Sequence, residues 1–234
     1  MTWALLTVLA APPDFATIER NKFEAFAQAT QFQGTYQVVA APTEGTAVRQ
    51  DVELALGEAG RKIRVFLGQR LIYESAWTKD RKWVADHQRQ AYTLVDAPGQ
   101  IPLTEPYRAL AAPANNLNFI VNDLGPRFAA DPMPVVQSEA AGTVDGKRVR
   151  TVTAVSNNAT TGGQVRLVQH FDEGTWIVRR FEITVSAAGK VSATITGFLR
   201  DDKRGPVAFG TFQLPSEVSQ KYRRVQTGSS REGG

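Results

Sequence analysis

The chain has 234 residues, carries a formal charge of +4 and contains no Cys. The absence of Cys excludes disulfides, thiolate metal ligands, Cys nucleophiles and a lipidated N-terminal Cys. The charge is small for this length and the basic residues are dispersed, which argues against a nucleic-acid partner. Hydrophobic residues make up 42% and charged residues 21%, ordinary values for a globular chain, so we expect one domain.

The N-terminal segment, residues 1–12, is apolar and uncharged and ends in small residues, which is typical of the hydrophobic region of an export signal. A basic region before it is missing, so a short N-terminal core segment is the alternative. Neither this segment nor any other stretch is long enough to cross a bilayer. The sequence therefore predicts a signal segment at 1–12, a soluble mature chain beginning between Ala11 and Asp14, a domain over 13–226 and a disordered tail over 227–234.

The stretch from Asp14 to Gln31 is predicted to be a helix. Asp14 can cap its N-terminus, and its apolar residues recur at spacings of three to five. These apolar residues are Phe15, Ile18, Phe23, Phe26 and Ala27. An amphipathic helix of this kind needs a partner surface.

Alternation of apolar and polar residues begins after the helix, and turns containing Gly, Pro or Asp separate the runs. The pattern predicts a series of hairpins whose strands are Phe32–Ala40, Ala47–Leu56, Lys62–Leu67, Leu71–Trp77, Arg81–His87 and Gln90–Asp96. It breaks between Ala97 and Pro134, where prolines exclude long strands and short helices are predicted at Tyr107–Ala111 and Asn115–Leu124. Such an insertion is either a packed cover over the sheet or a mobile lid.

Strands resume at Val135–Ala140 and Lys147–Val155. Three alternating runs then predict an antiparallel meander in which each break carries a Gly that can adopt a positive φ: Val165–Phe171, Trp176–Val185 and Val191–Leu199. One parity of this meander is apolar, namely Val165, Leu167, Phe171, Ile177, Phe181, Ile183 and Val185. A last strand is predicted at Ala208–Leu214. About ten or eleven strands are too many for one flat sheet, so we expect the sheet to curl toward a barrel.

The hairpin from Thr78 to Val95 resembles the LolA/LolB-like fold family of periplasmic lipoprotein carriers, which includes RseB-type sensor domains. The residues that carry the resemblance are Asp80, Trp83, Asp86, Gln90 and Tyr92, with Arg64 in the preceding strand, Phe171-Asp172, Gly189 and the closing AFGTFQLP segment. The resemblance implies a mainly β, single half-open antiparallel barrel with an N-terminal helix and a helical lid insertion. It also implies that acyl chains bind between the concave apolar face and the helices that cover it.

The resemblance suggests tentative site residues. The cavity lining would be Phe66, Trp77, Trp83, Tyr92 and Phe181, for which ordinary sheet core is the alternative. The lid would carry Leu117, Phe119, Ile120 and Leu124, and Arg64 would latch it through backbone carbonyls of Asn115–Leu124. A solvent-facing strand arginine is the alternative for Arg64.

Catalysis has little support in the sequence. There are two His, and no nucleophile elbow, zinc-protease or phosphate-loop motif is present. His87 reads as an exposed turn residue, and His170 with Asp172 and Glu173 makes a poor metal site. We therefore expect no cofactor and no metal, and a non-catalytic periplasmic protein that carries a lipoprotein or lipid by its acyl chain, with a membrane-associated donor or acceptor protein. The alternatives are a lipid- or lipoprotein-sensing domain acting through a protein partner and an unrecognised hydrolase.

Overall fold

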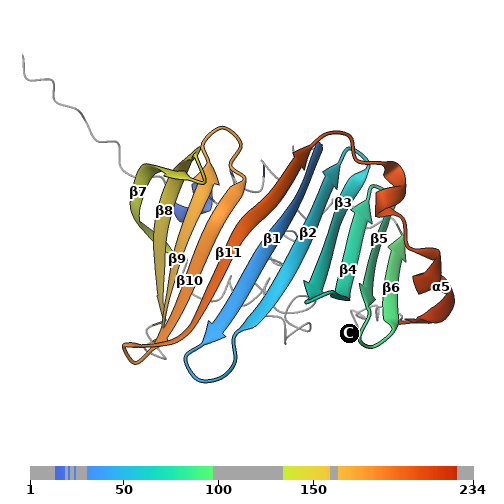
Figure 1. Ribbon diagram of the computed structural model, residues 1–234, viewed down its shortest axis with the longest axis horizontal. Coiled ribbons are helices and arrows are strands. Elements are labelled where there is room, and N and C mark those ends of the chain that lie inside the picture. Colours follow the sequence, from blue (N-terminus) through green and yellow to red (C-terminus); the bar gives the residue numbers. More distant parts are fainter. Residues whose placement is uncertain are drawn as a thin grey trace, which may run out of the picture.

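The computed structural model describes residues 14–18, 21, 24, 31–96, 134–158 and 163–225. The predicted signal segment, the lid with its apolar residues and the C-terminal tail lie outside the described residues. Within the described ranges the chain is built mainly from strands (Figure 1). The strands are β1 Gln31–Pro42, β2 Val48–Gly57, β3 Gly60–Leu67, β4 Arg70–Thr78, β5 Arg81–Asp86, β6 Ala91–Asp96, β7 Val135–Val144, β8 Lys147–Asn158, β9 Gly163–Asp172, β10 Val178–Ala187, β11 Lys190–Arg204 and β12 Arg223–Arg224.

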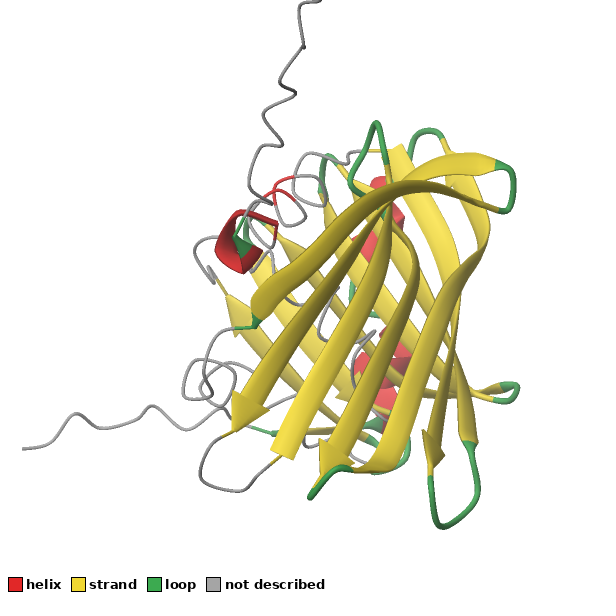
Figure 2. Cartoon of the chain, turned by 90° about the vertical axis from the view of Figure 1, so that its left-hand side faces the viewer, coloured by secondary structure: helices red, strands yellow, loops and turns green. Residues whose placement is uncertain are grey.

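All these strands belong to one 12-stranded sheet in the order β12-β6-β5-β4-β3-β2-β1-β11-β10-β9-β8-β7. Two meanders, β1–β6 and β7–β11, are joined where β1 pairs antiparallel with β11. The two-residue strand β12 pairs parallel with β6, whereas the other neighbours are antiparallel. The end strands of the described sheet do not pair, and the sheet curls around one of its faces (Figure 2). The predicted half-open antiparallel barrel is therefore confirmed, with β12 as an unpredicted strand.

The two faces of the sheet carry separate apolar cores. The inner face, the concave one, is defined by a large cluster that includes Val38, Leu54, Ile63 and Leu199. The described helical residues near the N-terminus belong to this face, because Ile18 is fully buried in the same cluster. The outer face carries a smaller cluster over β4–β6, formed by Ala76, Trp83, Ala85, Phe212 and Val218. The chain thus buries both faces of the same strands.

The described residues of the predicted N-terminal helix are helical from Phe15 to Ile18 and at positions 21 and 24. Asp14 caps them as predicted, since its Oδ1 accepts a hydrogen bond from the backbone N–H of Thr17 at 2.7 Å. Gln31, predicted as the last helical residue, instead begins β1. The strand therefore begins one residue before the apolar alternation of the sequence, and Gln31 pairs with Gly57 in the β1–β2 ladder.

One turn of the meander differs from the prediction. Gly189 adopts the expected positive φ of 76° between β10 and β11. In the preceding turn, however, the left-handed residue is Trp176, with a φ of 56°, and not Gly174. The Trp176 ring packs 5.5 Å from the ring of Phe171, and the backbone N–H of Trp176 donates to the Asp172 carbonyl at 2.9 Å. These contacts hold a bulky residue in a conformation that usually favours Gly.

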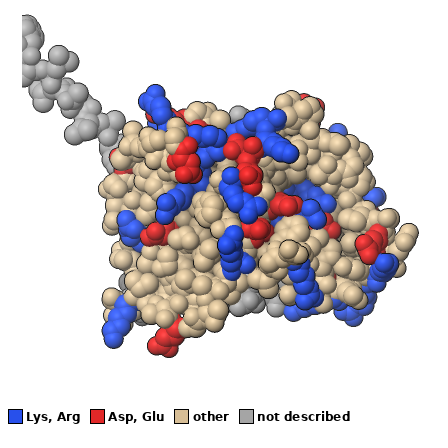
Figure 3. All heavy atoms as spheres, in the orientation of Figure 1, with Lys and Arg blue, Asp and Glu red and all other residues tan. Residues whose placement is uncertain are grey.

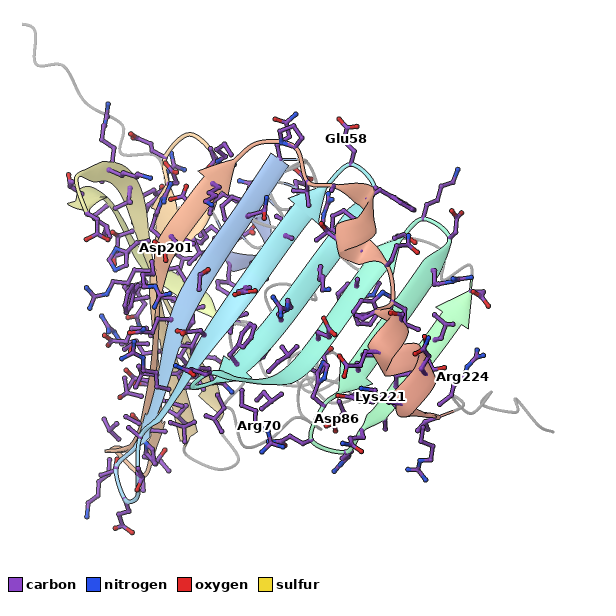
Figure 4. The ribbon with its side chains drawn as sticks, turned by 45° about the vertical axis from the view of Figure 1, so that its right-hand side comes forward. Glu58, Arg70, Asp86, Asp201, Lys221 and Arg224 are labelled. Atoms are coloured by element: carbon purple, nitrogen blue, oxygen red, sulfur yellow. The ribbon has the colours of Figure 1, made fainter. Side chains whose placement is uncertain are left out.

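The predicted last strand, Ala208–Leu214, is wrong. Its residues form the 3₁₀-helix η1 (Phe209–Phe212), followed by the short helix α5 (Ser216–Lys221). Phe212 is buried against the outer face, whereas Phe209 is 60% exposed. We call residues 206–225 the C-terminal strap, because they cross the outer face and end in β12 (Figure 4). A strand would leave Phe212 without this apolar contact, so packing overrides the alternating pattern.

Candidate ligand-binding site

The inner face presents an apolar wall. Of the predicted lining residues, Trp77 and Phe181 contribute most to this wall. Both belong to the inner cluster, with 0% and 3% of their surface exposed. The Phe181 ring lies over Gly197 of β11, where a Cβ atom would clash with it. Gly197 therefore makes the room in which Phe181 sits. Both residues therefore lie on the concave side, and their role in lining an acyl site stays a prediction.

Three polar groups in this wall have no hydrogen-bond partner among the described residues: Gln50 Nε2, Ser75 Oγ and Trp77 Nε1. All three residues are at most 2% exposed. Ser75 and Trp77 are two residues apart on β4 and therefore side by side on the same face. Gln50 and Ser75 were not predicted as site residues, although both occupy the apolar parity of their strands, which was the available signal.

Cationic residues flank Trp77 in the ladder. Trp77 pairs with Arg61 on one side and with Lys82 on the other, so the three side chains share a row on the inner face. Lys82 Nζ lies 5.0 Å from the centre of the Trp77 ring. Arg61 donates to the carbonyl oxygens of Gly57 and Gly60, and burial lowers the pKa of its guanidinium. The apolar wall therefore ends in a polar, donor-rich edge.

Trp83 and Tyr92 do not line the concave face, and the prediction that they do is wrong. Trp83 pairs with Ala76 and packs against Phe212, and its indole N–H donates to the Phe212 carbonyl at 2.8 Å. Tyr92 packs against the same outer cluster. Alternation places both residues opposite to Trp77, because strands β4–β6 bury aromatic side chains on both faces.

Phe66 and Arg64 also lie away from the inner face. Their neighbours Ile63 and Val65 are buried in the inner cluster, so alternation turns Arg64 and Phe66 outward. Arg64 Nη1 lies 3.0 Å from Glu53 Oε2, and its guanidinium stacks 4.8 Å from the Phe66 ring. The prediction that Arg64 spans the mouth of the inner cavity is therefore wrong. Its supposed partners in Asn115–Leu124 lie outside the described residues.

His87 is not the exposed turn residue that the sequence suggests. Its Nδ1 lies 2.8 Å from the hydroxyl of Tyr222, and its Nε2 lies 3.2 Å from Glu74 Oε1. Glu74 Oε2 lies 3.0 Å from Lys62 Nζ. Burial raises the pKa of Glu74, but the bonds from His87 and Lys62 outweigh burial and hold that pKa below its usual value. This network fastens the C-terminal strap to the outer face.

His170 lies on the outer face, where its Nδ1 is 2.9 Å from the Thr151 hydroxyl. Burial lowers the pKa of His170, and the neighbouring charge of Arg180 adds to this effect. The carboxylates close in sequence are engaged elsewhere, Asp172 with Arg179 at 2.8 Å and Glu173 with Arg148 at 3.0 Å. Among the described residues, no group of three His, Cys, Asp or Glu is arranged to hold a metal ion.

No protein-family model matches the sequence, and no curated protein matches it. The structure is similar to an uncharacterized conserved protein from Thermus thermophilus, at 13% identity over 90% of this chain and 98% of that one, with a TM-score of 0.46. It is similar to MucB of Pseudomonas aeruginosa in complex with MucA, at 14% identity over 86% of this chain and 61% of that one, with a TM-score of 0.46. A LolA superfamily protein from Nitrosomonas europaea is similar at 11% identity over 87% and 99%, with a TM-score of 0.37.

The class of protein follows from the sheet itself: a half-open antiparallel β-barrel with its larger core on the inner face. One of the similar solved structures is that of a LolA superfamily protein. At these identities the likeness concerns the fold alone. Within the part of the chain that the structure describes, none of the helices has the length and apolar character needed to span a membrane.

Proposed function

We propose that this chain is a non-catalytic, exported binding protein that holds the acyl chain of a lipid or lipoprotein against the inner face. The observation that carries the proposal is the apolar wall with unpartnered polar groups at Ser75 and Trp77. A buried polar group without a partner costs about 1–3 kcal/mol, so folded proteins rarely keep one without a reason. A ligand with an apolar chain and an oxygen-bearing end satisfies both features. Its chain packs on the wall, and its oxygen accepts a hydrogen bond from Trp77.

The energetics favour a carrier of this kind. Burial of apolar surface contributes about 0.8 kcal/mol per methylene, or roughly 13 kcal/mol for sixteen carbons before the costs of association. A carrier must also release its ligand, so only part of this free energy should appear as binding affinity. Partial shielding of the acyl chain by a half-open barrel meets this requirement better than a closed cavity does.

Quenching of tryptophan fluorescence by a brominated fatty acid tests the proposal, because bromine quenches only an indole that it contacts. The matched pair is Trp77→Phe, on the inner face, and Trp83→Phe, on the outer face, both in a chain with Trp3 and Trp176 replaced by Phe. Titration with dibromostearate should quench the Trp83→Phe variant, which retains Trp77, and leave the Trp77→Phe variant nearly unchanged. Equal quenching in both variants, or none in either, would contradict an acyl site on the inner face.

Native mass spectrometry of protein purified from cells separates the roles that an acyl site can serve. Co-purified acylated molecules support a carrier. A protein partner bound at one-to-one stoichiometry favours a sensor domain, and turnover of an added acyl ester favours a hydrolase. Export is tested by N-terminal sequencing of the mature protein: a start between Ala11 and Asp14 supports it, and an intact Met1 contradicts it.

A further inference from the structure

A hollow of about 550 Å³ lies on the outer face, on the opposite side of the sheet from the proposed acyl site. Its floor is formed by β11, β1, β2 and β3, and its wall by the C-terminal strap. Figure 3 views this side of the molecule and shows acidic and basic side chains interspersed across it. The volume lies in the range of small-molecule sites, about 300–1,000 Å³. We call this hollow the outer-face pocket.

The register of the sheet orders the floor of the outer-face pocket. One row runs across the strands as Lys203, Gln33, Ala55 and Lys62, and the next as Asp201, Thr35, Glu53 and Arg64. Ala55 leaves space in the first row because its neighbours are longer. The wall adds Thr211 and Gln213 as polar groups and Leu214 and Pro215 as an apolar shelf. The lining therefore combines many hydrogen-bonding groups with one apolar surface.

Most charges of the floor are already paired. Lys62 binds Glu74 at 3.0 Å, Arg64 binds Glu53 at 3.0 Å and Asp201 binds Arg200 at 3.0 Å. Lys203 has no acidic partner among the described residues, so the pocket retains one positive charge. Arg64 also lines the pocket, with its side chain 39% exposed and its Nη1 bound to Glu53, and a guanidinium carries five N–H donors. The floor therefore offers a ligand one positive charge without an acidic partner among the described residues, from Lys203, and further N–H donors, from Arg64.

We propose that the outer-face pocket binds a small, hydroxyl-rich carboxylate, such as a uronic acid or a disaccharide that contains one. Its carboxylate pairs with Lys203, and a ring or hydroxyl oxygen accepts an N–H of the Arg64 guanidinium. Three strand spacings of about 4.8 Å and an offset of one row, about 7 Å, put the two residues about 16 Å apart at the backbone, a span that two long side chains and a ligand of this size can bridge. The apolar C–H face of the sugar ring packs on Leu214 and Pro215, and its hydroxyls bond to Thr211 and Gln213.

The test uses three sugars that share one ring and differ in charge: glucuronate, glucose and glucosamine. Binding to isotope-labelled protein is followed by amide shifts of Ala55 and Thr211, which line the pocket. We expect glucuronate to bind about three- to fivefold more tightly than glucose, the ratio that one exposed ion pair supplies. Glucosamine should bind most weakly, because its charge repels Lys203.

The matched variants are Lys203→Gln and Lys190→Gln, which make the same change at opposite ends of β11. Lys203→Gln should reduce the affinity for glucuronate to that for glucose, and Lys190→Gln should leave it unchanged. Equal shifts with all three sugars, no shifts at Ala55 and Thr211, or the same loss in both variants would overturn the proposal. Acyl binding on the inner face has its own readout in Trp77 fluorescence, so either site can fail without the other.

Discussion

The indole N–H of Trp83 donates to the carbonyl oxygen of Phe212 at 2.8 Å, and so joins β5 to η1 across 129 residues of sequence. This bond lies within the outer cluster, which also buries the Phe212 ring. The strap then continues to β12. There the backbone N–H of Arg223 donates to the carbonyl oxygen of Gln90, and the backbone N–H of Val225 donates to that of Tyr92. The outer face of β4–β6 is therefore covered by the C-terminal strap.

Phe212 should be a major source of stability for the strap. Phe212→Ala removes a ring that is 1% exposed, and a large-to-small change in such a site costs about 3–5 kcal/mol in the free energy of unfolding. Phe209→Ala, in the same 3₁₀-helix but at a 60% exposed position, should cost less than about 0.5 kcal/mol. Urea denaturation measures both. Similar losses in the two variants would contradict the buried role of Phe212.

Gly60 should not tolerate a side chain. A Cβ atom there would clash with the carbonyl oxygen of Trp77, a backbone atom of the paired strand β4 that cannot move alone. We expect Gly60→Ala to lower the free energy of unfolding by about 1–3 kcal/mol. Gly142→Ala on β7 is the control, because its Cβ would meet its nearest atoms only at 3.8 and 3.9 Å. A thermal melt that ranks Gly142→Ala as the less stable variant would contradict the packing described here.

The ion pairs of Glu74 should make stability depend on pH. The pKa of Glu74 is held below its usual value in the folded chain, so its contribution is present above the unfolded value of 4.5 and is lost as the pH falls. Glu74→Gln should therefore lower stability at pH 7 and flatten the decline at acidic pH. Glu217→Gln is the control: its pair with Lys221 also holds the pKa of Glu217 below its usual value, but both side chains are exposed and screened by solvent, so the slope should change less than in Glu74→Gln. Denaturation at a series of pH values distinguishes these profiles, and parallel curves for Glu74→Gln and wild type would refute the prediction.

Arg179 should stabilise the junction of β9, β10 and β11. Its guanidinium binds Asp172 at 2.8 Å and Asp202 at 2.9 Å, and its side chain is only 9% exposed. Arg179→Ala removes the cation of Asp172 and leaves Asp202 with Lys147 at 3.4 Å, and should cost about 3 kcal/mol in the free energy of unfolding. Arg81→Ala breaks the pair with Asp96, whose side chains are 51% and 65% exposed, and should cost less than about 1 kcal/mol. Denaturation by guanidinium chloride measures both losses in the free energy of unfolding. Equal losses would contradict a larger contribution from the buried pair.

Most strands could be predicted from the sequence, because alternation is a local property that a few residues reveal. The capping role of Asp14 followed from a similarly local rule, whereas the half-open form of the barrel was implied only by the resemblance to a known family. The Ala208–Leu214 segment could not be predicted, since its conformation depends on a contact between Phe212 and a strand far away in sequence. Trp176 likewise adopts its positive φ because Phe171 packs against its ring.

The sequence by itself determined that the strands β4–β6 carry large apolar residues at both sets of alternate positions, such as Ile72 and Tyr73 on β4. It did not determine which aromatic residues face the concave side. Both sets of alternate residues are apolar in these strands, and alternation does not indicate which set points inward. The tertiary structure decided this through two distant partners. Register with β1 and β2 places Trp77 in the inner core, and the C-terminal strap covers Trp83 on the outer face. The physical reason is that local pattern divides residues between faces, whereas burial depends on which distant segment packs against each face.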